Sequence, residues 1–156
     1  MHSSGEINFI LVTKDGESFD GCKVSALDVI KRRIERNSWP IYEKTRGRKL
    51  FTKGSKIAFY IGGMSKASGK IIATAKIENI VLNSSYSMTD DYLIEEPAYL
   101  FLNFSNVQWL EVPIKVKEKI SKLSFCPQNM SKWGVVLMGG CRTLDNKDWF
   151  SLFSNS

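Results

Sequence analysis

The residues best suited to bind a ligand lie in one segment between positions 39 and 60. Trp39 opens the segment, the cations Arg46, Arg48 and Lys49 follow, and Tyr60 closes an apolar stretch. An aromatic ring can stack on any nucleobase, and cations attract a nucleic-acid backbone by releasing its counterions. A buried tryptophan followed by a solvated loop would give the same pattern. The segment therefore predicts either a nucleic-acid site or a core strand with a polar loop.

The charge of the chain is distributed unevenly along the sequence. The net charge is +6, but the stretch 23–76 contains 14 Lys and Arg and three acidic residues, a local net charge of +11. The stretch 77–111 contains six acidic residues and no Lys or Arg. A positive face of this kind favours polyanions. Acidic lipids or an acidic protein are alternatives, but the sequence has no long basic amphipathic helix and no lipidation signal. Nucleic acid is therefore the partner that we expect.

The sequence has few of the side chains on which catalysis usually depends. A nucleophile activated by histidine is disfavoured, because the only histidine is His2, near the N-terminus. The cysteines Cys22, Cys126 and Cys141 are odd in number and form no CxxC pair, which argues against a zinc knuckle or a disulfide framework. The stretch 63–71 is similar to a phosphate-binding loop, but it has one residue too many between its glycines and an isoleucine where Ser or Thr must hold magnesium. We expect no catalytic residue, no metal site and no cofactor.

Length and composition predict one globular domain over residues 1–156. Hydrophobic residues make up 43% of the chain and charged residues 24%, which is ordinary for a globular protein. A chain of this length buries roughly 68–70% of its unfolded surface, enough for a core of its own. No apolar run approaches the ~20 residues of a membrane span, and the polar N-terminus does not resemble a signal peptide. Together with the cysteine pattern, this predicts a cytoplasmic protein without membrane contact.

Hydrophobic periodicity predicts short strands that outnumber the helices. A first helix is expected after an N-cap at Ser25 and should end near Asn37, a short helix over 116–123, and a C-terminal helix after a cap at Asp145. The expected strands cover 7–12, 56–61, 70–80, 99–104, 107–112 and 135–138. Short strands separated by loops favour a small closed or nearly closed barrel with helices packed on it.

Four features of the chain, taken in order, resemble the EVE domain of the PUA-like superfamily. An apolar strand at 8–13 ends in a hydroxyl residue, and Trp39 precedes the basic loop. The stretch 53–60 is similar to the family's turn and strand, with Ser55 in place of the usual Asp. The stretch 132–149 resembles its final strand, Gly-containing turn and closing helix. The resemblance covers nearly the whole chain, and the same superfamily includes YTH and ASCH domains.

The resemblance implies an α+β fold: a PUA-like pseudo-barrel of five or six mostly antiparallel strands with flanking helices. It implies a non-catalytic module that reads a modified base flipped into an aromatic cleft, with modified DNA favoured over RNA. Related EVE domains occur alone or attached to modification-dependent restriction nucleases and their McrB-type GTPases, so a motor or nuclease subunit is an expected partner. The alternatives are an RNA-modification reader, an adaptor that binds a small molecule or a protein in the same cleft, and an enzyme that uses carboxylates.

The predicted site residues come from two sources. The family pattern implies that Trp39 and Thr13 face the base, and Tyr60 and the loop residue Tyr86 are candidates for further walls of an aromatic cage. Thr13 and Lys14 both lie where the first strand ends, within reach of a base edge. Charge alone supplies the phosphate-binding candidates, which are Lys14, Arg46, Arg48 and Lys49.

Overall fold

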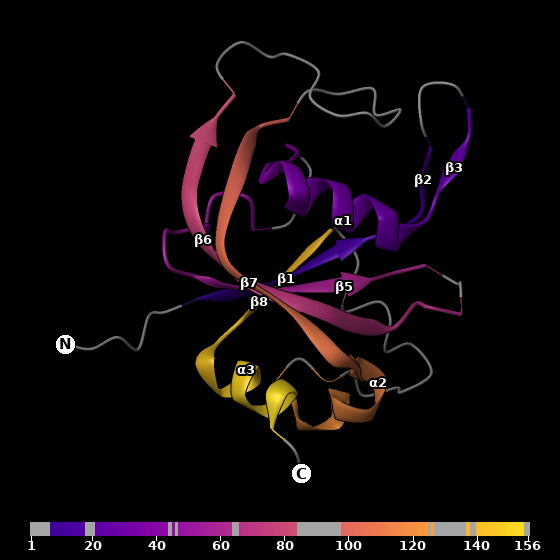
Figure 1. Cartoon of the computed structure of the whole chain (residues 1–156). Helices are drawn as coiled ribbons and strands as arrows, with labels where there is room; N and C mark the ends of the chain where they lie inside the picture. Colours follow the sequence, from indigo (N-terminus) through magenta and orange to yellow (C-terminus); the bar gives the residue numbers. More distant parts are fainter. Residues whose placement is uncertain are drawn as a thin grey trace, which may run out of the picture.

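The fold is a curled six-stranded sheet with helices on both of its faces. The computed structural model describes residues 7–17, 21–43, 45, 47–63, 66–83, 98–124, 126, 137 and 140–154. One helix lies on one side of the sheet, and two helices lie on the other side (Figure 1). The predicted α+β pseudo-barrel of five or six mostly antiparallel strands is confirmed.

The sheet brings together strands that are far apart in the sequence. Neighbouring strands are antiparallel, except that β1 and β5 are parallel. In sheet order the strands are β4 (Trp39–Ile41), β7 (Leu100–Lys115), β6 (Lys70–Leu82), β5 (Lys56–Ile61), β1 (Asn8–Thr13) and β8 (Cys141–Leu144). The strands β2 (Gly16–Glu17) and β3 (Lys23–Val24) form a separate small hairpin. The helices are α1 (Ala26–Arg36), α2 (Val116–Lys119), which continues as the 3-10 turn Ile120–Lys122, and α3 (Asn146–Phe153).

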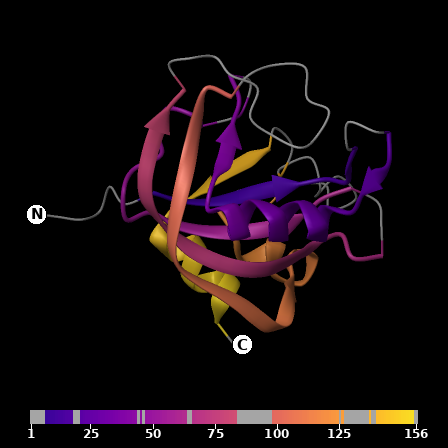
Figure 2. The same ribbon diagram turned by 45° about the horizontal axis from the view of Figure 1, so that its top comes forward.

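The long strands β6 and β7 give the sheet its curl. Their pairing register shifts at three places. The two strands bend strongly along their length, as Figure 2 shows. At one shift Lys76 pairs with Ser105 and Thr74 with Gln108, and Asn106 between them has a left-handed backbone with φ of 56°. The expectation of two strands joined at 105–106 was wrong, because this bulge bends the strand without ending its pairing.

The inner face of the sheet packs against α1. Trp39 of β4 belongs to this inner core, with 3% of its side chain exposed. Its ring centroid lies 5.0 Å from that of Phe59 and 6.1 Å from that of Phe104. Phe59 and Phe104 are themselves in edge contact at 5.2 Å. Three aromatic rings from β4, β5 and β7 therefore join the edge of the sheet to its centre.

The outer face packs against α2 and α3. Ile10 of β1 and Tyr60 of β5 belong to this outer core, together with Val116, Ile120 and Leu152 of the helices. Burial raises the pKa of Tyr60 to about 12. The N-cap of α3 is Asp145, whose side chain accepts a hydrogen bond from the backbone N–H of Asp148 at 2.7 Å, as the sequence predicted.

The ends of α1 fix where β4 begins. Ser25 caps the helix through a 3.1 Å hydrogen bond from the backbone N–H of Asp28, as predicted. Asn37 ends it with φ of 53°, and its side-chain oxygen accepts a 2.6 Å hydrogen bond from the backbone N–H of Phe104 in β7. This cap directs the chain onto the edge of β7, where Trp39 starts a strand that the sequence did not predict. The strand expected at 135–138 lies outside the described residues apart from Leu137.

We predict that Trp39→Ala lowers the free energy of unfolding by about 3–5 kcal/mol, because truncating a buried aromatic ring removes packing and leaves a cavity. Denaturant titration of both proteins measures the change. Trp109→Ala is the matched control, since the Trp109 side chain is 45% exposed and its loss should cost far less. A Trp39→Ala protein as stable as the Trp109→Ala control would contradict the placement of Trp39 in the core.

We predict that the free energy of unfolding falls at high pH because the buried phenol of Tyr60 ionises. Its folded pKa is raised from 10.0 to about 12, so the stabilisation of the neutral phenol is complete below pH 10 and is lost as pH rises toward 12. The shift corresponds to about 2–3 kcal/mol. Ultraviolet titration of the five tyrosines should show one late ionisation that Tyr60→Phe removes. Simultaneous ionisation of all five in the folded protein would count against it.

Candidate nucleic-acid interface

A buried hydroxyl without a partner marks the carboxyl end of β1. Thr13 is 4% exposed, and its Oγ1 has no hydrogen-bond partner among the described residues. The backbone around it is well paired, since the Gly62 N–H donates to the Thr13 carbonyl oxygen at 2.8 Å. A buried polar atom that is left unpaired costs about 1–3 kcal/mol, so such atoms call for a reason. The Thr13 hydroxyl thus keeps a hydrogen-bonding capacity that the described protein does not use.

Side-chain alternation along β1 gives Thr13 its direction. Phe9 and Leu11 belong to the inner core, whereas Ile10 belongs to the outer core. Successive residues of a strand point to opposite faces, so Thr13 points to the inner face, two residues beyond Leu11. Trp39 lies on the same face and contacts Phe59, which pairs with Leu11 across β1 and β5. The structure therefore brings Thr13 and Trp39 to one face of the sheet.

The basic loop after β4 is folded by its own turns. The Tyr42 N–H donates to Thr45 Oγ1 at 3.1 Å, and the Thr45 N–H donates back to the Tyr42 carbonyl oxygen at 3.0 Å. A second turn follows, because the Leu50 N–H donates to the Gly47 carbonyl oxygen at 2.9 Å. Gly47 has φ of 74°, which other residues rarely adopt. The described residues of the loop therefore form two hydrogen-bonded turns.

Two described residues of the loop contact the segment that contains β8. A Cβ on Gly140 would lie 3.9 Å from Thr45 Cγ2, and a Cβ on Gly47 would lie 3.4 Å from Thr143 Cγ2. The carbonyl oxygen of Gly140 accepts a hydrogen bond from the Val12 N–H at 2.9 Å. Gly140 thus lies between the basic loop and the residue that precedes Thr13. Thr45 of the loop therefore lies near the end of β1 that carries Thr13, whereas Gly47 lies against Thr143, the register partner of Phe9.

The predicted phosphate-binding residues have different environments. Lys14 and Lys49 are exposed, whereas Arg48 is half-buried. The Arg48 guanidinium lies 5.5 Å from the ring centroid of Tyr99, and its Nε is 3.6 Å from Glu43 Oε2. Part of the binding capacity of Arg48 is therefore used within the protein. Arg46 lies outside the described residues.

The predicted aromatic cage is divided between the two faces of the sheet. Trp39 belongs to the inner core, and Tyr60 belongs to the outer core. The neighbour of Tyr60 in sequence, Phe59, is the residue that contacts Trp39, and period-two alternation along 56–61 was the signal that could have found it. Trp39 and Tyr60 cannot enclose one base between them. Tyr86 lies outside the described residues, and the base-binding roles stay predictions.

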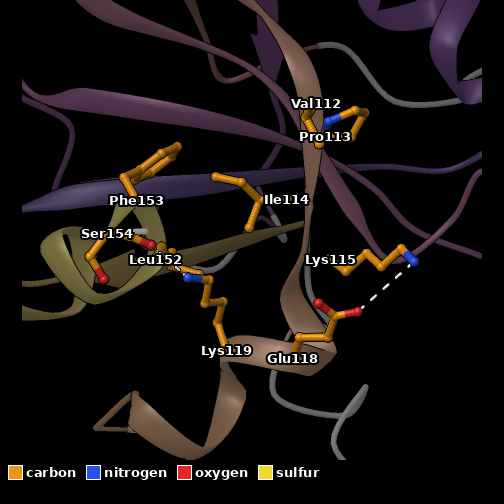
Figure 3. A pocket seen from close by; sticks show the side chains of 9 residues that line it. All are labelled: Val112, Pro113, Ile114, Lys115, Glu118, Lys119, Leu152, Phe153 and Ser154. Carbon is orange, nitrogen blue, oxygen red and sulfur yellow. Dashed lines mark hydrogen bonds and ion pairs between the residues drawn. The ribbon is translucent and has the colours of Figure 1, made fainter. Parts of the chain in front are cut away.

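A groove of about 600 Å³ lies on the outer side of the molecule. It runs between the end of β7, α2 and the end of α3, where Phe153 and Ile114 face the hollow and Lys115 pairs with Glu118 at 3.9 Å (Figure 3). Lys119 Nζ closes one side by donating to the Ser154 carbonyl oxygen at 2.6 Å. None of the predicted base- or phosphate-binding residues lines this groove.

The described part of the chain has neither a candidate metal site nor a candidate membrane-spanning helix. Within it, no group of three or more His, Cys, Asp or Glu side chains lies close enough together to hold a metal ion. None of the helices described here is long and apolar enough to cross a membrane.

Comparison with known proteins rests on structure. No family profile and no curated protein matches the sequence. The fold is similar to that of human THYN1, solved in complex with DNA containing 5-methylcytosine, with a TM-score of 0.58 and 11% identity over 92% of this chain and 94% of that one. It is also similar to the N-terminal domain of Staphylothermus marinus McrB, with a TM-score of 0.60 and 9% identity over 96% of this chain and 94% of that one.

Both likenesses extend over nearly the full length of each chain, so they concern the whole fold rather than a shared supersecondary motif. At 9% and 11% identity they carry no information on individual side chains. The chain has the PUA-like fold that its resemblance to EVE domains implies.

Proposed function

We propose that the protein is a non-catalytic DNA-binding module that reads a modified base flipped out of the duplex. The observation that carries this proposal is the buried, unpartnered hydroxyl of Thr13 beside a basic loop. The similarity to a protein solved with DNA containing 5-methylcytosine supports the choice of DNA and of a modified base. The base edge would take the hydrogen bond that Thr13 lacks within the described protein.

Electrostatics supports a duplex approaching from this end of the molecule. Lys14 follows Thr13 directly and is exposed, and Lys49 is exposed on the basic loop. In our proposal these two side chains contact phosphates on either side of the extruded nucleotide, and Arg46 and Arg48 add to the positive field. Such contacts carry affinity without sequence information, whereas the base contact carries specificity.

The proposal gives Trp39 the role of an inner wall for the base. It is the predicted aromatic residue that shares a face with Thr13, and its contact with Phe59 leads toward β1. Since the ring is 3% exposed, a base reaches it only if neighbouring side chains move. Tyr60 takes no part in this inner pocket, because it packs on the outer face.

The similarity to a McrB N-terminal domain supports a second element of the proposal, which concerns partners. We propose that the module supplies the recognition step of a modification-dependent restriction system, where a separate motor or nuclease acts on the DNA. Binding of the module to modified DNA would then recruit that activity to the site.

We predict that Thr13→Val weakens binding to an oligonucleotide with 5-methylcytosine by about tenfold, the scale of one lost hydrogen bond to a buried partner. Affinity for the unmodified duplex should change little, because an unflipped base does not reach Thr13. Stability should rise by about 1 kcal/mol, since a buried hydroxyl without a partner is replaced by a methyl group. Fluorescence anisotropy and thermal denaturation measure the two effects.

Thr52→Val is the matched control for this experiment. The Thr52 hydroxyl already has a partner, Ser55 Oγ at 2.8 Å, so its loss should lower stability and leave base preference unchanged. Modified-base preference that persists undiminished in Thr13→Val would remove Thr13 from the site and with it the main support for the proposal.

We predict that affinity for DNA falls with salt, with a log–log slope of roughly −2 to −4. Lys14→Gln combined with Lys49→Gln should reduce the magnitude of this slope by about 2 and weaken all sequences alike, because phosphate contacts do not read bases. The pair Lys117→Gln and Lys147→Gln removes the same charge from the exposed surfaces of α2 and α3. Equal effects of the two pairs would mean that only net charge matters.

A further inference from the structure

Two lysines face each other on the outer surface of the sheet. Lys56 at the start of β5 is the register partner of Lys76 in β6, so their side chains lie on the same face. Like charges directly opposite each other across two strands destabilise a sheet. Neither ammonium group has an ion-pair partner among the residues that the structure describes. This repulsion would be relieved by an anion bound between the two lysines.

A small hollow lies beside this lysine pair. Its volume is about 140 Å³, and its lining combines two ammonium groups, two carboxamides, a hydroxyl and an indole ring. The residues that line it are Lys56, Thr74, Ala75, Lys76, Asn106, Gln108 and Trp149. Six of these side chains are able to donate hydrogen bonds through N–H or O–H groups, and none carries a negative charge. The hollow therefore suits an acceptor-rich anion.

Contacts of Lys56 and the bulge in β7 position the residues around this hollow. Lys56 Nζ lies 5.8 Å from the ring centroid of Trp149, and the backbone N–H of Lys56 donates to Asn8 Oδ1 at 3.3 Å. The bulge in β7 gives Asn106 its left-handed backbone, between the pairs that Ser105 and Gln108 form with β6. The carboxamides thus come from a fixed irregularity of the sheet rather than from a loop.

Size selects among the anions. At about 30 Å³ for each water molecule, the hollow of about 140 Å³ has room for roughly five waters, which suits a phosphate group but not a whole nucleotide. Two lysine ammonium groups and neutral amide donors are a common environment for phosphate oxygens. The indole ring would lie beside whatever group the phosphate carries.

We propose that this hollow, the Lys56–Lys76 site, binds a phosphate group. It is separate from the Thr13 end of the molecule, because Lys56 lies on the outer face of β5 with Ala58 and Tyr60, near the start of the strand. The site does not depend on the function proposed above. The phosphate is supplied either by a nucleic-acid backbone or by a small phosphate ester, and both present the same oxygens.

Titration of the isotope-labelled protein with inorganic phosphate, against chloride at equal ionic strength, tests the site. We expect saturable shifts of the backbone amide resonances of Lys56, Thr74, Asn106 and Gln108 with phosphate alone. In the double variant Lys56→Gln/Lys76→Gln these shifts should need at least fivefold more phosphate. The control Lys31→Gln/Lys117→Gln, which removes the same charge from α1 and α2, should bind phosphate like the unmodified chain.

A second arm uses an unmodified single-stranded oligonucleotide and distinguishes the sources of the phosphate. Weaker binding of the oligonucleotide by Lys56→Gln/Lys76→Gln than by the control assigns the site to a nucleic-acid backbone, and unchanged binding assigns it to a small phosphate ester. Absence of saturable phosphate shifts, or shifts that are equal in the two double variants, would overturn the proposal. Because Gln108 is exposed on the surface, Gln108→Ala provides a second variant that keeps both charges.

Discussion

The pseudo-barrel depends on a loop that joins the two free edges of its sheet. β4 and β8 are the edge strands, and an open edge exposes unpaired backbone groups. The chain leaves β4 at Ile41, folds through two turns, and packs Gly47 against Thr143 of β8. The loop thus connects the two edge strands, and its described cations Arg48 and Lys49 lie on this connection.

The strand β1 connects this closure to the rest of the molecule. It pairs in parallel with β5 on one side and antiparallel with β8 on the other. Its side chains alternate between the inner core, through Phe9 and Leu11, and the outer core, through Ile10. Both cores therefore fix its register, because a slip of one residue would exchange the two sets. The inward direction of Thr13 follows from the same register, and its burial has the same cause as that of Leu11.

Much of this fold could be predicted from the sequence where the signals are local. The strand at 56–61, the N-caps at Ser25 and Asp145, and the helix over 116–123 rest on alternation, capping chemistry and apolar spacing, all of which act within a few residues. β4 was missed because three residues that include a proline give no pattern of their own and pair only through the sheet. The sequence placed Trp39 and Tyr60 in one cage, but their side chains lie on opposite faces of the sheet. Which face each side chain takes depends on long-range packing between strands. The position of Thr13 and Lys14 at the end of β1 could be predicted, because the apolar stretch 9–12 ends directly before them.

The two ends of the described chain meet at β1. Asn8 pairs with Leu144 in the sheet, and its side-chain amide donates a 2.9 Å hydrogen bond to Asn146 Oδ1, 138 positions later. Contacts between residues so far apart in the sequence require the closure of a very long loop, which costs entropy and slows folding. During synthesis from the N-terminus, the edge of β1 that pairs with β8 stays without its partner strand until residues 141–146 have been made. The sheet is thus completed only after β8 (Cys141–Leu144), far beyond β1 in the sequence, has been synthesised.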